Sequence, residues 1–368
     1  MPLEDIRSER IKKLGKLQDP YPASTRRTHL IAEVLKKFGS LAKSKNKISL
    51  TGRVMAKREH GGSMFLDVQD GTGKIQVYLK EDMLGDEYRH ALDSVDIGDF
   101  LEVAGKAFKT KRGEPTLEVS KWRMLAKSLR SLPEKWHGLQ DVEERFRKRY
   151  LDLLMNQEVR GRFELRSKII KALREFHEKN GFLEVETPML HPLPGGALAQ
   201  PFRTHHNALD VDLYLRIAPE LYLKRLLIGG LEKVYEIGKS FRNEGIDKDH
   251  NPEFTMLESY AAYWDEEQMM KFVEGLFLNL AKLSFIRNYG GSTSIVKQFA
   301  RVTFKDLLKR YALITDYDRE SRESLIKRAK RLGVKVAPYE TKGKIADEIY
   351  KKICRPYLIQ PTFVINHP

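Results

Sequence analysis

The stretch FRNEGIDKDHNPEF, residues 241–254, places charged and polar side chains between two segments that read as β-strands. Because side chains alternate across a strand, Arg242 and Glu244 should share one face of the first strand, and Phe254, Glu258 and Tyr260 one face of the second. An arginine on a strand offers a planar fork to phosphate or carboxylate, and an aromatic ring offers a face to a nucleobase. A strand face with these side chains suits a ligand that carries an anionic group, a cationic group and a flat ring.

The same residues also admit a structural interpretation. A generic hairpin would pair Arg242 with a glutamate across the strands and bury Phe254 in the core. Likewise, Glu220 and Glu258 would pair with Lys224 or Arg242 instead of binding a ligand. Burial of unpaired charge is costly, however, so a face with one guanidinium and two carboxylates is poorly suited to a hydrophobic core.

The segments around this loop predict an α+β body built on antiparallel strands. RSKIIKALREFHEKNGF, residues 166–182, reads as an amphipathic helix closed by a glycine, and FLEVETPML, residues 182–190, as the strand that follows. VDLYLRI, residues 211–217, alternates apolar and polar residues as a strand buried on one face should. PELYLKRLLIGG, residues 219–230, reads as a helix with proline in its first turn.

The N-terminal half has a different pattern. Five short segments rich in β-branched and aromatic residues are separated by glycine, aspartate and lysine turns, at residues 48–58, 63–70, 73–79, 100–109 and 115–125. Their number and spacing predict a small five-stranded barrel. On a basic chain, a barrel of this type commonly binds single-stranded nucleic acid.

Composition limits the classes of protein to consider. The chain has 368 residues, 41% of them hydrophobic, which excludes a disordered protein, and its net charge of +15 favours a polyanionic partner. Residues 1–150 hold 31 basic and 22 acidic side chains, whereas residues 151–300 hold 19 and 21. A single cysteine excludes an intrachain disulfide and a cysteine-based zinc site. Without a signal-peptide core or an apolar run long enough to span a membrane, the sequence predicts a cytoplasmic protein.

We therefore expect four consecutive parts in the chain. These are a basic helical segment, a barrel domain, a polar linker and an α+β body, at residues 1–46, 47–130, 131–155 and 156–368. An equally open interpretation of the first part is that its lysines form only a solvated face.

Three stretches resemble the class II aminoacyl-tRNA synthetases. FRNE followed by HNPEF resembles motif 2 of that class, and GFLEVETPML resembles motif 1. PGGALAQPFRTHHNALDVDLYLRIAPELYLKRLLIGGLEKVYEIGKSFRNEG resembles the lysine-specific branch, the lysyl-tRNA synthetases of bacteria. The resemblance implies an OB-type anticodon-binding barrel, an antiparallel-sheet catalytic domain with flanking helices, and a helical insertion at about residues 301–356. It also implies a homodimer formed through motif 1.

Roles for single residues follow from matching positions. In this family the motif 2 arginine, here Arg242, is catalytic and holds the α-phosphate of ATP together with the amino-acid carboxylate. Glu244 would accept from the adenine amino group, and Phe254 would stack on the ring. His250 and Asn251 would meet the outer phosphates.

The resemblance also assigns the amino-acid pocket and the tRNA contact. Glu220 and the backbone of Gly196 would receive the α-amino group of lysine, and Tyr260 and Glu258 its side-chain ammonium. In the barrel, three residues match positions that read the anticodon of the tRNA, namely Phe65, Gln76 and Glu114. Taken alone, Phe65 would more often be a residue of the barrel core.

The implied reaction is the activation of L-lysine by ATP, with Mg²⁺, to lysyl-adenylate, and its transfer to the 3′ end of the cognate tRNA. One rival is a protein-lysine ligase, but relatives of that kind lack the barrel predicted here. A second rival is a tRNA-binding paralogue or fragment without activity.

The chain also departs from the family pattern. It stops at PTFVINHP, and no glycine-rich motif 3 ending in arginine is found before that point. The metal-binding carboxylates of the family would lie beyond Pro368, so no metal ligand is predicted within the chain. The sequence thus predicts a C-terminally truncated synthetase that binds tRNA, with lysine activation by this chain alone in doubt.

Overall fold

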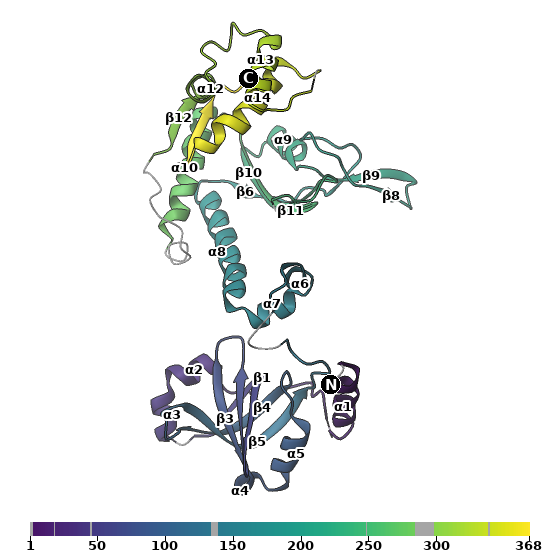
Figure 1. Cartoon of the computed structure of the whole chain (residues 1–368), viewed down its shortest axis with the longest axis vertical. Helices are drawn as coiled ribbons and strands as arrows, with labels where there is room; N and C mark the ends of the chain where they lie inside the picture. The colour runs from purple at the N-terminus through teal and green to yellow at the C-terminus, as the bar shows by residue number, and fades with distance from the viewer. Residues whose placement is uncertain are drawn as a thin grey trace. The chain divides into compact units, whose positions relative to one another are not determined.

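The computed structural model describes residues 3–17, 19–44, 46–133, 139–247, 249–283, 298–337 and 339–368. The chain divides into two compact units, residues 1–159 and 160–368 (Figure 1). Residues 134–138 of the expected linker lie outside the described residues, and α6 (Val142–Arg147) and α7 (Arg149–Met155) occupy its second part. In the ranges given above, no helix is long and apolar enough to cross a membrane.

The first unit contains the predicted barrel. Its strands close in the order β1-β2-β3-β5-β4, with β3 and β5 parallel and the other neighbours antiparallel. The strands are β1 (Ile48–His60), β2 (Ser63–Gln69), β3 (Lys74–Lys80), β4 (Phe100–Lys109) and β5 (Pro115–Ala126). Two short helices join β3 to β4, namely α4 (Glu81–Leu84) and α5 (Asp86–Ser94).

Alternation along the strands fills the barrel. On β2, Met64, Leu66 and Val68 are fully buried, while Phe65 between them points outward and is only partly buried. Gly105 on β4 permits a close approach, because a Cβ there would lie 1.8 Å from the carbonyl oxygen of Glu118 on β5. The barrel is therefore a packed core with functional side chains available only on its outer surface.

Three helices and an extended segment precede the barrel. The helices are α1 (Leu3–Leu14), α2 (Ile31–Lys36) and α3 (Phe38–Ser44). Ile31, Val34 and Phe38 are buried in the barrel's hydrophobic cluster. These apolar residues anchor the segment to the barrel, whereas Lys36, Lys37 and Lys43 are exposed, so the solvated-face interpretation of its lysines stays open.

The second unit is built around a hairpin and three helices. β10 (Lys233–Phe241) pairs antiparallel with β11 (Glu253–Ala261) and parallel with β6 (Leu183–Glu184). The expected strand over residues 182–190 is therefore short. A second sheet has the order β7-β9-β8, with strands Leu190–His191, Val211–Leu215 and Arg203–His206. The helices are α8 (Gln157–Lys179), α9 (Glu220–Ile228), which lies against β10 and β11, and α10 (Glu266–Lys282) (Figure 1).

The last part of the chain forms a small helical cluster beside two parallel strands. Its elements are β12 (Ala300–Thr303), α12 (Phe304–Ala312), α13 (Arg322–Arg331), α14 (Lys342–Ile349), the π-helical turn η1 (Tyr350–Cys354), the 3₁₀ turn η2 (Arg355–Tyr357) and β13 (Thr362–Ile365). Cys354 is fully buried in this cluster, and its thiol donates to the carbonyl oxygen of Leu307 at 3.4 Å. Burial raises the pKa of the Cys354 thiol to about 11.

Candidate active site and nucleic-acid interface

The β10–β11 hairpin places the predicted site residues on one face. Phe254 lies opposite Ser240, Glu258 opposite Glu236 and Tyr260 opposite Val234. The pairing continues past the end of β10, because the backbone N–H of Arg242 donates to the carbonyl oxygen of Pro252 at 2.9 Å. Directly opposite residues of an antiparallel pair point to the same side. Arg242 therefore shares this face with Phe254, Glu258 and Tyr260, as the alternation predicts.

Arg242 contacts an aromatic ring instead of a carboxylate. Its guanidinium carbon lies 5.1 Å from the ring centroid of Phe254, within the range of a cation–π interaction. No ion pair between Arg242 and a glutamate is found in the described part of the chain, so the cross-strand Arg–Glu pair of a generic hairpin is not formed. The Nε atom of Arg242 is buried and has no hydrogen-bond partner. A buried donor without an acceptor indicates a place prepared for an anion.

Glu244 does not follow the predicted alternation. β10 ends at Phe241, so Glu244 lies in a bend beyond the strand and is exposed. Its Oε1 atom accepts from the backbone N–H of Gln200 at 3.3 Å, and the N–H of Asn243 donates to the carbonyl oxygen of Gln200 at 2.7 Å. The prediction that Glu244 shares the face of Arg242 on one strand is therefore wrong, because hydrogen bonds to Gln200, which is distant in the sequence, replace the strand pairing.

The loop after Glu244 is organised by Asp247. The Oδ1 atom of Asp247 accepts from the backbone N–H groups of Asp249 at 2.7 Å and His250 at 2.8 Å. The ring nitrogen Nδ1 of His250 lies 2.9 Å from the same carboxylate. The N–H of Asp249 and the imidazole of His250 hold the pKa of Asp247 below its ordinary value. His250 and Asn251 are both exposed at the end of this loop.

Gly196 and Glu220 are brought together at the start of α9. Gly196 has a positive φ of 85°, and a Cβ at this position would lie 3.0 Å from the Cβ of Glu220. The carboxylate of Glu220 also pairs with Lys224 one helical turn later, at 2.7 Å. The structural interpretation of Glu220 is consistent with its ion pair with Lys224. The ligand-binding interpretation is consistent with its position beside Gly196.

Glu258 and Tyr260 form a hydrogen-bonded pair on the face of β11. The hydroxyl of Tyr260 donates to Oε2 of Glu258 at 3.0 Å. Burial raises the pKa of Glu258, with a further contribution from the charge of Glu220, while the hydrogen bond from Tyr260 opposes the shift. Burial, together with the charge of Glu258, also raises the pKa of Tyr260. The carboxylates of Glu258 and Glu220 are both partly buried, and together they make this end of the face suitable for a cation.

A buried arginine beside this face was not predicted from the sequence. Arg216 is 1% exposed, and its Nη1 atom donates to Oε1 of Glu236 at 2.5 Å. Its Nε atom donates to the carbonyl oxygen of Lys239 at 2.7 Å, and Oε2 of Glu236 accepts from the hydroxyl of Thr187 at 2.6 Å. A Cβ on Gly238 would lie 2.2 Å from Nη2 of Arg216. The guanidinium therefore occupies the space that a side chain at position 238 would need.

Three buried polar atoms without partners gather on or against this face of β10. They are Nη2 of Arg216, Oγ of Ser240 and Nε of Arg242. In VDLYLRI, Arg216 reads as an outward-pointing polar residue, because its partners at Thr187 and Glu236 are distant in the sequence. One sequence feature could have indicated the buried arginine. It is Gly238, on a strand otherwise rich in larger residues, because a glycine within a strand often marks a place where another group approaches the backbone closely.

On the barrel, Phe65 and Gln76 lie on one outer surface. The ring of Phe65 stacks on Tyr78 with centroids 4.6 Å apart, and Tyr78 lies 6.1 Å from Phe108. Gln76 accepts from the hydroxyl of Thr116 at 3.0 Å. The register pairs Phe65 with Tyr78 and Asp67 with Gln76, which places these side chains on the same outer face. Phe65 is therefore a surface aromatic and not a residue of the barrel core.

The third predicted barrel residue occupies the loop between β4 and β5. Glu114 is exposed, and its backbone N–H donates to the hydroxyl of Thr110 at 3.1 Å. It precedes Pro115, the first residue of β5, the strand that pairs with β3 through Gln76 and Thr116. The additional aromatic residues Tyr78 and Phe108 extend the surface started by Phe65. Sequence alternation on their strands could have identified both.

The described residues do not fit a bound metal ion on their own. Within the described ranges, no group of three or more histidine, cysteine, aspartate or glutamate side chains could hold one. Mg²⁺ prefers several oxygen ligands in octahedral geometry. The described residues therefore offer no complete set of protein ligands for this ion.

Two protein-family models match this chain. The model of the class II tRNA synthetases (D, K and N) matches residues 141–368, and that of the OB-fold nucleic acid binding domain matches residues 48–125. Lysine–tRNA ligase of Carboxydothermus hydrogenoformans is 48% identical over 100% of this chain and 76% of its own length. The corresponding enzymes of Moorella thermoacetica and Pelotomaculum thermopropionicum are each 45% identical, over 99% and 100% of this chain and 76% and 74% of their lengths. The chain belongs to the lysine–tRNA ligase family of the class II aminoacyl-tRNA synthetases.

Proposed function

We propose that this protein is a lysine–tRNA ligase, which joins L-lysine to ATP as lysyl-adenylate and transfers the lysyl group to the 3′ end of a lysine-specific tRNA. The observation that carries the proposal is the face shared by Arg242, Phe254, Glu258 and Tyr260. Its two ends differ in charge. A cationic, aromatic end suits the nucleotide, and an acidic end suits the lysine ammonium groups.

At the nucleotide end, Arg242 is the catalytic residue. The lysine carboxylate attacks the α-phosphorus of ATP, the bond to the bridging oxygen breaks, and pyrophosphate leaves with the electron pair. The unpartnered Nε of Arg242 supplies a donor for the charge that develops on the α-phosphate. Phe254 stacks on the adenine, and Glu244 accepts from the adenine amino group.

The loop that ends the first strand completes the nucleotide site. His250 and Asn251 are exposed there, at the position proposed for the outer phosphates. The carboxylate of Asp247 holds the imidazole of His250 in place, because Nδ1 of His250 lies 2.9 Å from it. Mg²⁺ would accompany ATP and neutralise its phosphates, and no ligand for it is assigned within the described chain.

At the acidic end, Glu258 and Tyr260 receive the side-chain ammonium of lysine. Glu220 and the backbone of Gly196 receive the α-amino group. Tyr260 already donates to Glu258, so one carboxylate oxygen is oriented before the substrate arrives. This division uses one carboxylate for each amino group of lysine.

The barrel carries the proposed anticodon contact. Phe65 offers a ring on which a splayed base can stack, and Gln76 and Glu114 offer hydrogen-bonding groups to base edges. The stacked ring of Tyr78 supports Phe65 from the other side. The cognate tRNA is therefore recognised in the barrel as well as at its 3′ end.

We further propose a cytoplasmic homodimer formed through motif 1, at about residues 166–190. Three apolar side chains on this segment are exposed, with Leu183 at 52%, Met189 at 45% and Leu190 at 43%. A two-fold interface would cover such a patch, because the same surface serves both partners.

The decisive test is lysine-dependent ATP–pyrophosphate exchange by the full-length protein and its Arg242→Ala variant. Loss of a donor to the reacting phosphate should lower the exchange rate at least about 10²–10³-fold. Arg331→Ala is the matched control, because Arg331 is exposed on α13 and removes the same charge from the same unit. Exchange within a few-fold of wild type for Arg242→Ala would contradict the assignment.

A further inference from the structure

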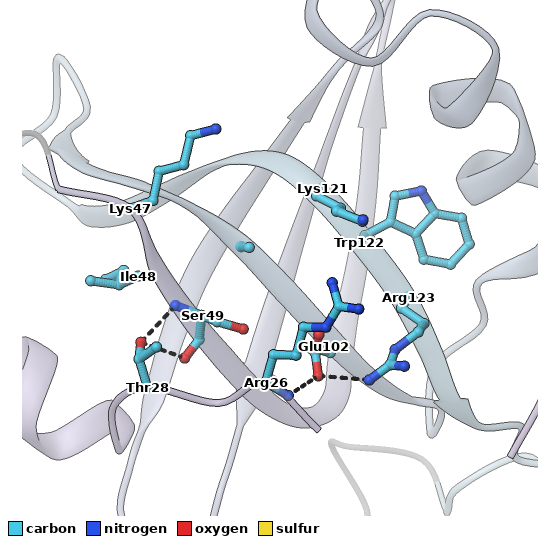
Figure 2. A pocket seen from close by; sticks show the side chains of 10 residues that line it. Arg26, Thr28, Lys47, Ile48, Ser49, Glu102, Lys121, Trp122 and Arg123 are labelled. Carbon is cyan, nitrogen blue, oxygen red and sulfur yellow. Dashed lines mark hydrogen bonds and ion pairs between the residues drawn. The ribbon is translucent and has the colours of Figure 1, made fainter. Parts of the chain in front are cut away.

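A pocket lies on the barrel, on strands other than β2 and β3, which carry Phe65 and Gln76. The pocket has a volume of about 330 Å³ and is formed by β1, β4, β5 and the extended segment before α2 (Figure 2). This volume is in the range of small-ligand sites in proteins. Seven of the residues that line it are polar or charged: Arg26, Thr28, Lys47, Ser49, Glu102, Lys121 and Arg123.

Strand register brings these side chains together. Ser49 on β1 lies opposite Ala104 on β4, which lies opposite Lys121 on β5. Glu102 and Arg123 form the neighbouring row, so both rows point to the outside of the barrel. The walls are thus part of the sheet itself and not of a loose surface loop.

The extended segment is fixed to these strands by backbone hydrogen bonds. The N–H of Thr28 donates to the carbonyl oxygen of Ser49, and the N–H of Ser49 donates to the hydroxyl of Thr28, both at 2.9 Å. The N–H of Arg26 donates to Oε2 of Glu102 at 2.6 Å, which fixes the backbone of Arg26 at the pocket wall. The segment therefore forms one side of the pocket (Figure 2).

The charge of the pocket is positive. Glu102 is 8% exposed and accepts from Arg123 at 3.0 Å in addition to the N–H of Arg26, so its charge is compensated. Arg26, Lys47 and Lys121 are exposed, and within the described chain no ion pair is found for any of the three. Three cationic groups thus remain available around one opening.

Two buried polar atoms in this pocket have no partner. They are Oγ of Ser49, a residue that is 7% exposed, and Nε of Arg123. A buried polar group without a partner is costly, and most such groups in folded proteins are satisfied. A ligand with several acceptor oxygens would satisfy both atoms and balance the three cations.

We propose that this pocket binds a phosphate group of the tRNA backbone, on a barrel surface separate from the one that reads the anticodon. Phosphate oxygens suit the guanidinium fork of Arg26, the two ammonium groups and the hydroxyl of Ser49. The inference rests on the proposed function as a tRNA ligase, because tRNA supplies the phosphodiester. A free phosphate or nucleotide has the same chemistry and is separated from RNA by the experiment.

The test compares the full chain with the double variant Arg26→Ala, Lys121→Ala. Binding of lysine-specific tRNA is measured by fluorescence anisotropy between about 50 and 300 mM salt, a range over which phosphate contacts weaken strongly. We expect the double variant to bind about tenfold more weakly, and its slope of log affinity against log salt to fall by about 0.7–0.9 for each lost contact. Ser49→Ala, which keeps the charge, should weaken binding by a smaller factor.

The matched control is Lys12→Ala, Lys36→Ala, which removes the same charge from exposed positions on α1 and α2 outside the pocket. An equal loss in both double variants would overturn the inference, because net charge alone would then explain it. Binding of inorganic phosphate or pyrophosphate that depends on Arg26 and Lys121, with unchanged tRNA affinity, would also overturn it. If the wild-type chain does not bind tRNA, the proposed function fails as well, whereas wild-type binding with unaffected variants removes this inference alone.

Discussion

The Nη1 atom of Arg216 donates to Oε1 of Glu236 at 2.5 Å, and this buried ion pair lies directly against Gly238. Because Arg216 is also held by Lys239 and Thr187, its guanidinium cannot move aside without breaking other hydrogen bonds. Gly238→Ala should therefore lower the free energy of unfolding by about 1–3 kcal/mol, the usual cost of overpacking. Urea denaturation measures the change.

A second glycine gives the control for this prediction. Gly245→Ala adds the same methyl group where no described atom lies within 4 Å of the new Cβ, so stability should stay close to wild type. A Gly238→Ala protein as stable as Gly245→Ala would show that the buried pair rearranges freely.

Glu258 should give the lysine site a pH dependence. Its pKa is raised, chiefly by burial, so the folded state holds this proton up to a higher pH than the unfolded state. The contribution of Glu258 to the unfolding free energy should thus fall as pH rises from below the ordinary glutamate pKa to above the raised one. Denaturation of wild type and Glu258→Gln between about pH 4 and 8 should show this fall in the difference between the two unfolding free energies, because the other titrating groups are common to both proteins.

The same carboxylate should control the affinity for lysine. Glu258→Gln should raise the KM for lysine in pyrophosphate exchange by about 10–100-fold, the value of a charge-assisted hydrogen bond. In wild type, the KM should also rise as pH falls through the raised pKa, because the neutral acid no longer attracts the ammonium. An unchanged KM in the variant would place the lysine side chain elsewhere.

The outer face of the barrel should affect transfer to tRNA but not lysine activation. Phe65→Leu removes the stacking ring, which contributes about 1–3 kcal/mol per base in single-stranded recognition. The KM for tRNA in aminoacylation should rise, while pyrophosphate exchange stays at the wild-type rate. Gln76→Ala and Glu114→Ala should act in the same direction.

Phe65→Tyr serves as the conservative variant, because it keeps an aromatic ring at the position that stacks on Tyr78. It should retain most of the tRNA affinity. Equal loss of exchange and aminoacylation in Phe65→Leu would indicate a collapsed barrel instead of a lost base contact.

The exposed apolar strand residue Leu183 should be needed for dimerisation. Leu183→Glu would place charges facing each other across a two-fold interface and should convert the dimer to a monomer in sedimentation velocity. Ile359→Glu, at a position that is 89% exposed and outside motif 1, is the control. A wild-type chain that is monomeric at every concentration would remove the interface from the proposal.

Hydrophobic patterns in the sequence predicted strands well where the same alternation extended over the whole segment. Alternation identified the five barrel strands and placed Phe254, Glu258 and Tyr260 on one face, because β11 is regular over its whole length. Glu244 was misplaced because the alternation was continued past Phe241, where a hydrogen bond from Asn243 to the Gln200 carbonyl ends the strand. The end of a strand depends on such distant partners, which a local period does not contain.

Buried charges were the part that sequence patterns could not predict. Arg216 reads as a solvent-facing residue, and only its contacts with Glu236 and Thr187 show that it is part of the core beneath the site. Similarly, the pairing of His250 with Asp247 follows from the conformation of the loop. The role of a charged residue depends on which residues lie next to it in the folded chain. It can therefore be determined only when the structure is known.

The thiol of Cys354 can report on opening of the helical cluster formed by residues 304–357. With a pKa of about 11, only about one thiol in a thousand is ionised at pH 8, and burial shields the sulfur from reagents as well. A maleimide or disulfide reagent should therefore react only when this cluster opens, and no other cysteine in the sequence competes for the label. The labelling rate of the unmodified chain would then measure how often the cluster opens in solution, without any engineered probe.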